Sequence, residues 1–242
     1  MTEKPIFDIL MLLARPAAGK SEVIDYLKRT PEDQRISRFH VGNISEIDDF
    51  PMLWAWFEED ALLEKMGYPH VYTDRQGYFL GNHLWDLLIE RICLEFTKLQ
   101  VRTKGVHAGT TLIEFSRGTE HGGFSRAFEH LSHEVLVRTN ILFLQVSWEE
   151  SLRKNRKRFN PEQPDSILEH SLSDEKMERL YKGSDWADLT ANSPDYLRIQ
   201  GVQVPYVVFE NEDDVTTPRG EELGRRLETC LSRLYNLRQA IK

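Results

Sequence analysis

The stretch "LLARPAAGKSEV", Leu12 to Val23, puts an apolar run, a short loop and the start of an amphipathic segment in direct succession. Its centre follows a pattern of a glycine, any four residues and then Gly-Lys-Ser or Gly-Lys-Thr. Ala14 stands in the place of the first glycine, and residues 19–21 complete the pattern. The apolar residues before the loop predict a buried strand over residues 6–14, and those after it predict a helix over residues 21–28. The pattern therefore lies between a strand and a helix, which is the context that it requires.

Each residue type in this loop has a chemical reason. Backbone N–H groups and the N-terminus of the following helix form a concave site for an anion. Gly19 lets the chain approach a phosphate without a Cβ atom between them. Lys20 can neutralise the β- and γ-phosphates, and the Ser21 hydroxyl can bind Mg²⁺. We therefore expect Ala17, Ala18, Gly19, Lys20 and Ser21 to bind a nucleoside triphosphate with Mg²⁺.

The composition is that of an ordinary globular protein. Of the 242 residues, 40% are hydrophobic and 29% are charged, and we find no internal repeat or Pro/Gly/Ser-rich linker. We expect a single domain over residues 1–242, with insertions. The net charge of -8 argues against general binding to nucleic acid or to an anionic membrane.

The cellular location is inferred from the cysteines and the N-terminus. The N-terminal run "IFDILMLLA" is interrupted by Asp8 and is too short to span a bilayer. Cys93 and Cys230 lie in amphipathic runs that predict helices, which suggests reduced thiols. We expect a cytoplasmic protein, and a homodimer is left open.

Alternating strand and helix patterns indicate the fold class. Residues 111–115, 141–146 and 204–209 are short and rich in Ile, Leu, Val and Phe, as buried parallel strands are. Residues 36–41 are a weaker strand candidate. Helical patterns lie between these runs, for example over residues 84–99. The alternation predicts a three-layer α/β fold with a doubly wound parallel sheet and helices on both faces.

The last helix is predicted to begin in "TTPRGEEL", with Thr217 as its N-cap and Pro218 in its first turn. A seam of apolar residues follows, spaced by four and three residues. Such a seam is more often packed on a sheet than used as a dimer zipper. Its members are Leu223, Leu227, Cys230, Leu234 and Leu237.

Two further segments hold charged groups that could act on a bound phosphate. Glu114 ends the apolar run in "TTLIEFSRG", where it could hold Mg²⁺ directly or through water. "VSWEESLRKNRKRF" is interpreted as a lid that closes over the triphosphate, with a solvated helix face as the alternative. A nucleic-acid patch is disfavoured because no aromatic residues are interleaved. The basic residues of this segment are Arg153, Lys154, Arg156, Lys157 and Arg158.

The chain resembles the phosphate-loop (P-loop) kinases of the nucleoside and nucleoside monophosphate kinase type. The matching pieces are "ARPAAGKS", "LIEFSRG", "ILFLQVSWEESLRKNRKR" and "VPYVVFENEDDV". The resemblance implies a five-stranded parallel sheet, ATP and Mg²⁺, and transfer of the γ-phosphoryl group to a small acceptor. It also implies that the loop near Asn211 lies beside the adenine. The acceptor region would cover residues 43–105 and the lid region residues 150–200, both approximately.

The sequence does not fix the general base, which in nucleoside kinases is an acid at the end of the second strand. Asp48 and Asp49, in "NISEIDDFPM", lie further from the weak strand over residues 36–41 than this pattern suggests. They could instead cap the next helix, and Glu114 is a third candidate. Arg117 follows Glu114 at a spacing that differs from the Glu-Arg pair of deoxynucleoside kinases. The subfamily therefore stays open.

The interval between the loop and Glu114 is rich in aromatic residues, which would suit a flat acceptor. Any single aromatic residue there is more readily explained as part of the core. The polar segment "TDRQG" is the part that we assign to the acceptor. The predicted substrate-binding residues are Asp74, Arg75 and Arg117.

Other classes of protein fit these residues less well. "DRQG" has the Asp-x-x-Gly form of a GTPase switch, but the guanine-binding Asn-Lys-x-Asp is absent. The intact Lys20 and Ser21 speak against a degenerate interaction module, while a nucleotide sensor without kinase activity stays an alternative. The net negative charge disfavours a kinase for polynucleotide ends. The acceptor is not identified, since nucleosides, nucleotides, sugars and other hydroxyl compounds all stay open.

Overall fold

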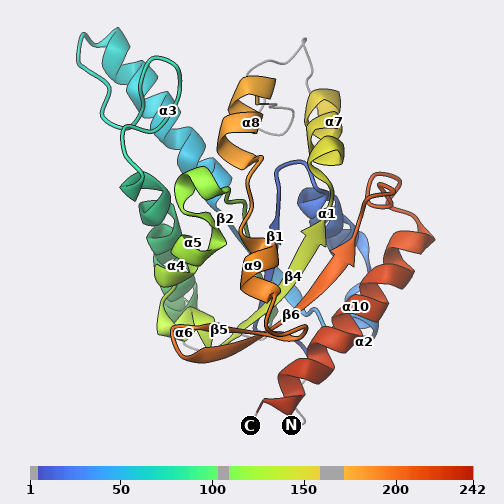
Figure 1. Ribbon diagram of the computed structural model, residues 1–242. Coiled ribbons are helices and arrows are strands. Elements are labelled where there is room, and N and C mark those ends of the chain that lie inside the picture. Colours follow the sequence, from blue (N-terminus) through green and yellow to red (C-terminus); the bar gives the residue numbers. More distant parts are fainter. Residues whose placement is uncertain (1–4, 103–108, 159–171, 242) are drawn as a thin grey trace.

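The computed structural model describes residues 5–102, 109–158 and 172–241. In this part of the chain a six-stranded sheet has the order β2-β3-β1-β4-β6-β5 (Figure 1). Neighbouring strands from β2 to β6 pair in parallel, and β5 pairs antiparallel with β6 at one edge. The strands are β1 (Ile9–Ala14), β2 (Asn43–Asp48), β3 (Gly109–Phe115), β4 (Thr139–Gln145), β5 (Tyr196–Ile199) and β6 (Val202–Glu210).

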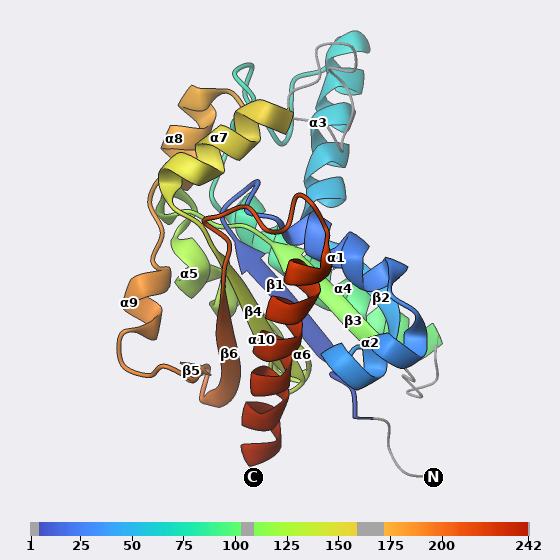
Figure 2. The same ribbon diagram turned by 90° about the vertical axis from the view of Figure 1, so that its right-hand side faces the viewer.

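Helices cover both faces of the sheet, and others stand at its carboxyl edge (Figures 1 and 2). One face carries α1 (Lys20–Arg29), α2 (Glu32–Phe39) and α10 (Glu221–Ala240). The other carries α4 (His83–Arg102), α5 (Gly123–Glu129), α6 (His133–Leu136) and α9 (Trp186–Thr190). At the carboxyl edge lie α3 (Asp49–Lys65), α7 (Trp148–Arg158) and α8 (Asp174–Tyr181).

The central strands are apolar on both faces because helices cover both. On β1, Leu10 and Leu12 join the core under α1 and α10, while Ile9 and Met11 join the core under α4 to α6. The predicted seam of the last helix packs into the first of these cores. Leu223, Leu227 and Leu234 are buried there, and Cys230 and Leu237 pack against them. The prediction that the seam packs on the sheet is confirmed.

Three predictions about local structure are wrong. Residues 36–41 are not a strand, because residues 36–39 are the end of α2 and His40 is its C-cap. The buried Arg35 of this helix donates to three backbone carbonyls. The strand next to β3 is β2, at the sheet edge, in which only Ile47 is buried. The sheet also has a sixth, antiparallel strand, β5, and is therefore not the predicted five-stranded parallel sheet.

The third error concerns the start of the last helix. The helix α10 begins at Glu221, with Gly220 and not Thr217 as its N-cap. Thr217 instead closes a turn, since its hydroxyl donates to Asp214 at 2.7 Å. Between that turn and the helix, Arg219 adopts a left-handed φ of 51°.

Two structural facts bear on the predictions about the cysteines and the membrane. Cys93 is buried and Cys230 is half-buried, and both are free cysteines. Within the described residues, no helix combines the length and the apolar character needed to cross a membrane.

Candidate functional site

The loop between β1 and α1 has the strand–loop–helix context that the sequence predicts. Its backbone is left-handed at Ala17 (φ 58°) and at Gly19 (φ 108°). A Cβ atom on Gly19 would lie 2.5 Å from Thr216 Oγ1 and 2.8 Å from Asn211 Nδ2. Both the dihedral angle and the available space therefore require glycine at this position.

Side chains from distant segments hold the carbonyl groups of this loop. Ser151 Oγ, on α7, donates to the carbonyl of Pro16 at 2.7 Å. Asn211 Nδ2, after β6, donates to the carbonyl of Ala18 at 2.8 Å. Because C=O and N–H point in opposite directions across a trans peptide, the N–H groups that follow these carbonyls are turned to the other side of the loop.

The backbone N–H groups of the loop have no hydrogen-bond acceptor among the described residues. In the described part of the chain, no acceptor receives a hydrogen bond from the N–H groups of residues 17–22. The first such bond of α1 is donated by Val23, to the carbonyl of Gly19 at 3.1 Å. A row of unpaired N–H groups at the N-terminus of a helix is a binding site for an anion.

The side chain of Asn211 forms its hydrogen bonds within the protein. Its side chain is fully buried, and Nδ2 also donates to Thr216 Oγ1 at 2.8 Å. Its Oδ1 accepts the backbone N–H of Thr216 at 3.3 Å. The amide therefore supports the loop from behind, and the predicted neighbourhood of an adenine stays a prediction.

Lys20 lies among carboxyl groups at the carboxyl edge of the sheet. Its Nζ donates to Ser116 Oγ at 2.8 Å, just after β3. Asp48, at the end of β2, is the register partner of Glu114 on β3, and β3 pairs directly with β1. The parallel sheet thus brings both acids to the side of the loop that carries Lys20.

Burial and mutual repulsion shift the titration of these groups. Burial lowers the pKa of Lys20, while the negative charges of Glu114 and Asp48 raise it. Burial, with the nearby Glu114 and Asp49, raises the pKa of Asp48 to about 8. Burial also raises the pKa of Glu114, which the positive charge of Lys20 opposes. Asp48 is therefore a carboxyl group that can take up a proton near neutral pH.

The two neighbouring aspartates have different partners. Asp48 Oδ1 accepts the N–H of Phe50 at 2.9 Å, so Asp48 caps α3 and lies beside Lys20 at the same time. Asp49 Oδ2 accepts a hydrogen bond from Arg117 Nη1 at 2.6 Å, and both side chains are buried. The structure thus leaves Asp48 as the less engaged of the two.

Arg117 belongs to the framework of the site. Its Nη1 also donates to the carbonyl of Ser116 at 2.7 Å, and its Nη2 donates to the carbonyl of Trp85 at 3.2 Å. The guanidinium carbon lies 5.2 Å from the centroid of the Trp85 ring. These contacts join the end of β3 to α3 and α4, and contact with an acceptor stays a prediction.

Of the three arginines predicted to act as a lid, Arg158 lies beside the loop. Its Nη2 is 3.6 Å from Glu22 Oε2, in the first turn of α1, and its charge acts on Lys20 and Glu114. Arg153 instead pairs with Glu150 and Asp214, and Arg156 pairs with Asp174. Residues 159–171, in the middle of the predicted lid region, lie outside the described residues.

The segment "TDRQG" forms a hairpin turn. Asp74 Oδ1 accepts the N–H groups of Gln76 and Tyr78, both at 2.9 Å. A Cβ atom on Gly77 would lie 2.6 Å from Lys176 Nζ, so the turn is next to α8. These contacts explain Asp74 as a turn residue, and the substrate contacts of Asp74 and Arg75 stay predictions.

Four of the aromatic residues between the loop and β3 belong to a third core. Trp56, Trp85, Met177 and Tyr181 are buried together, and Tyr72 and Phe79 pack against them. This core joins α3 and α4 to α7 and α8. The interpretation as core is confirmed for Trp56 and Trp85, whereas Tyr68 is 59% exposed. Residues 103–105 of the predicted acceptor region are not described.

Several residues that shape the site were missed by the sequence analysis. Ser151 donates to the Pro16 carbonyl of the loop, and Thr216 accepts from the Asn211 amide that holds the Ala18 carbonyl. Both residues lie far from the loop in the sequence, and no local pattern marks them. Ser116 accepts from Lys20, and Asp60 accepts the N–H groups of Val71, Tyr72 and Thr73. The burial of Asp60 is known only from the structure, so the sequence does not mark this residue.

The roles of Ser21 and Glu114 as metal ligands stay predictions. Ser21 is exposed in the first turn of α1, and Glu114 is the last residue but one of β3. The described residues contain no group of three or more His, Cys, Asp or Glu side chains that could hold a metal ion. Mg²⁺ binds by a few protein oxygens together with water and phosphate oxygens, so these residues suit a phosphate-bound Mg²⁺.

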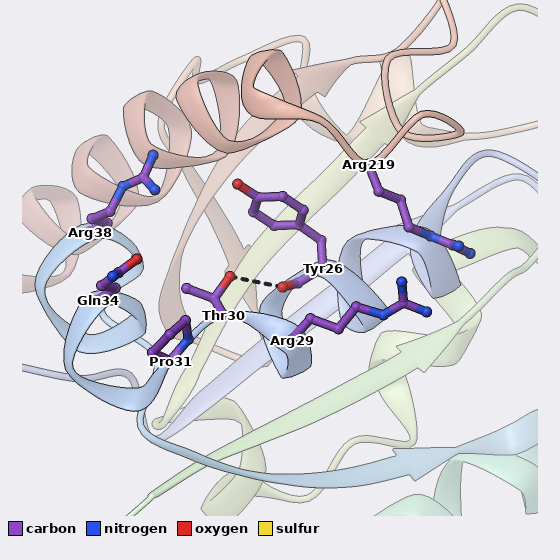
Figure 3. A pocket seen from close by; sticks show the side chains of 7 residues that line it. All are labelled: Tyr26, Arg29, Thr30, Pro31, Gln34, Arg38 and Arg219. Atoms are coloured by element: carbon purple, nitrogen blue, oxygen red, sulfur yellow. Dashed lines mark hydrogen bonds between the residues drawn. The ribbon is translucent and has the colours of Figure 1, made fainter.

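A cavity of about 260 Å³ lies away from this site, at the far end of α1 (Figure 3). Three arginines line it: Arg29, Arg38 and Arg219. Asp25 faces both Arg29 and Arg219, and Glu228 bonds to Arg38. Because each arginine has a carboxylate partner, we explain their presence by these ion pairs.

Comparisons with known proteins do not assign a family. No family model and no curated protein matches the chain. A solved structure titled "Crystal structure of APE1195" aligns over 99% of this chain and 97% of that chain, with 14% identity and a TM-score of 0.40. The strand order and the loop of the present structure are themselves consistent with a P-loop NTPase-like fold.

Proposed function

We propose that this protein transfers the γ-phosphoryl group of ATP to a hydroxyl group of a small acceptor, with nucleosides as the first compounds to test. The observation that carries the proposal is the position of Lys20. It stands at the open donors of the loop and, at the same time, beside the half-buried acids Asp48 and Glu114. An anion site next to a proton acceptor is what phosphoryl transfer to a hydroxyl requires.

The nucleotide side of the site is built from positive charge and N–H donors. The open N–H groups of residues 17–22 would accept the phosphates, with Lys20 at the β- and γ-phosphates. Arg158 would add charge from α7. Ser21 and Glu114 would hold Mg²⁺, which neutralises charge on the phosphates when it is bound. The base and ribose would lie toward the loop that contains Asn211.

The acceptor side favours a hydroxyl compound over a phosphorylated one. A hydroxyl group must lose a proton during transfer, whereas a phosphate acceptor is already an anion and needs no base. Asp48 and Glu114 offer carboxyl groups on this side, and the guanidinium of Arg117 is committed to Asp49 and to backbone carbonyls. A hydroxyl group could therefore donate to Asp48, whereas Arg117 is not available to match the charge of a phosphate monoester.

In the proposed reaction Asp48 takes the proton of the acceptor hydroxyl. The acceptor oxygen bonds to the γ-phosphorus, the bond from that phosphorus to the β,γ-bridging oxygen breaks, and ADP leaves with the bonding electron pair. Lys20 and Arg158 stabilise the charge that moves to the bridging oxygen. Most of the rate enhancement then comes from positioning and from neutralised charge.

The test is ADP release from ATP with a panel of nucleosides, nucleoside monophosphates and sugars. We expect release to depend on one class of unphosphorylated hydroxyl compound. Lys20→Ala should abolish it, and Asp48→Asn should lower it by about a hundredfold or more. Asp195→Asn is the matched control for removal of a carboxylate and should keep the activity, because Asp195 pairs with Arg233 of α10, away from the site.

Two results would count against the proposal. Transfer that survives in folded Lys20→Ala protein would show that the loop is not the phosphate site. Tight binding of ATP or GTP without transfer to any acceptor would favour the alternative, a GTPase-like switch or nucleotide sensor. Transfer to a nucleoside monophosphate alone would keep the kinase and remove the argument for a hydroxyl acceptor.

A further inference from the structure

The outer face of α4 carries large apolar side chains. Its inner face packs Ile89, Ile92 and Phe96 into the core, as expected for a helix on a sheet. On the opposite side Leu87, Leu94 and Val101 are 42%, 50% and 72% exposed. A helix that only covers a sheet is normally polar on its solvent side, and Figure 1 shows α4 on the outside of its layer.

These three residues form one stripe. They are seven residues apart, which is close to two helical turns, so their side chains lie in a line along the helix. The stripe is about 21 Å long at 1.5 Å per residue. A repeat of seven is the spacing at which two helices pack side by side at a small crossing angle.

Charged residues beside the stripe are arranged symmetrically about Leu94. Glu90 comes four residues before it and Lys98 four residues after it, while Leu87 and Val101 are seven residues before and after. In two antiparallel helices related by a two-fold axis at Leu94, positions equally distant from the axis face each other. Glu90 of one copy would then face Lys98 of the other. Leu87 would face Val101.

A parallel arrangement of the same helices lacks this complementarity. It would put Glu90 opposite Glu90 and Lys98 opposite Lys98, and like charges across an interface repel. In the single chain Lys98 bonds to Glu95 at 2.7 Å, and Glu90 faces His130 at 3.1 Å. These are exposed pairs of small energy, so they can be exchanged for pairs between two copies.

We propose that two copies of this protein associate through α4, antiparallel, with the two-fold axis at Leu94. The apolar seam of α10 is buried on the sheet and cannot serve this purpose. The stripe is narrower than the roughly 800 Å² per partner of a standard interface, so the association is weak and depends on concentration. The inference is independent of the proposed catalysis, since Leu94 lies outside the site.

Sedimentation equilibrium of the full chain over about a hundredfold range of concentration measures the association. The apparent mass should rise from 28.3 kDa toward twice that value. Leu94→Glu should weaken the dimer at least about tenfold because it puts two carboxylates at the axis. Leu62→Glu is the matched control, since Leu62 is 58% exposed on α3 and lies off the stripe.

Two further variants test the register. Leu94→Cys should form an intermolecular disulfide under mild oxidation, whereas Leu87→Cys alone should not, and the unmodified chain controls for Cys93 and Cys230. Glu90→Lys should weaken the dimer, and adding Lys98→Glu should restore it. These are surface changes, so they decide the question even if Leu94→Glu fails to fold. A monomer at every concentration, equal effects of the α3 control, or no rescue by the charge reversal would overturn the proposal.

Discussion

Asn211→Ala separates support of the loop from direct contact with a nucleotide base. The variant removes two hydrogen bonds that Nδ2 donates and one that Oδ1 accepts. At about 1 kcal/mol for each bond, the free energy of unfolding should fall by about 3 kcal/mol. For a chain of this size that is a decrease in Tm of about 6–12 °C.

The effect on binding follows from the Ala18 carbonyl, which loses its donor. The peptide between Ala18 and Gly19 is then free to rotate, and its N–H no longer points to the phosphate. Loss of one hydrogen bond to a charged group is about 1.5–3 kcal/mol, or about ten- to hundredfold in Kd. In the proposed complex this N–H contacts only phosphate, so ATP, GTP and inorganic tripolyphosphate should lose affinity equally.

Asn140→Ala is the matched control. Asn140 is also a buried asparagine, and its Nδ2 donates to the carbonyls of Ile9 and Arg138, both at 3.0 Å. It lies at the amino end of β4, away from the loop, so its loss should lower Tm and leave Kd unchanged. Calorimetric titration measures both variants. A loss of affinity for ATP but not for tripolyphosphate would refute the support role and indicate contact with the adenine.

Three further predictions concern the loop, the acids and the lid. Gly19→Ala should lower the free energy of unfolding by about 2–4 kcal/mol, because of the positive φ and the clash with neighbouring side chains. Gly220→Ala has open space around it and should lower it by less than about 1 kcal/mol. Chemical denaturation compares the two variants. The raised pKa of Asp48 means that the folded protein binds this proton more tightly than the unfolded chain does. The free energy of unfolding of the wild type should therefore fall as the pH rises from 4 to about 8. Asp48→Asn should lack that fall, and equal pH profiles of the two proteins would refute the raised pKa. Arg158→Ala should slow phosphoryl transfer about a hundredfold, and Arg156→Ala should have little effect on the rate; steady-state kinetics tests whether the two differ.

The sequence predicts the centre of the fold better than its edges. The strand β1 and the helix α1 could be predicted because a fully buried strand is continuously apolar and a helix shows its own period. The strand β2 was missed because an edge strand exposes most of its side chains, and "NISEID" has one buried residue. The apolar residues of α2 gave a false strand signal, since a short helix with a few buried residues has little period to display.

The candidate site was predictable only where it is local in the sequence. Gly19, Lys20 and Ser21 are contiguous, so a pattern identifies them. The hydrogen bonds of Asn211 and Ser151 to the loop join segments more than a hundred residues apart, and no residue-by-residue pattern encodes such a pairing. Asp48 was found as a candidate, but its position beside Lys20 follows only once β2 is known to pair with β3.

The replacement of the first glycine by Ala14 has a structural explanation. Ala14 is the last residue of β1, fully buried, and it is in register with Leu144 of β4. Within the described loop the left-handed angles are at Ala17 and Gly19, so the turn does not need a glycine at position 14. A small residue suffices there, since it has to fit between strand and helix. The alanine at position 14 therefore does not indicate a degenerate loop. The alternative of an interaction module without nucleotide binding rested on this alanine, so it is no longer supported by it.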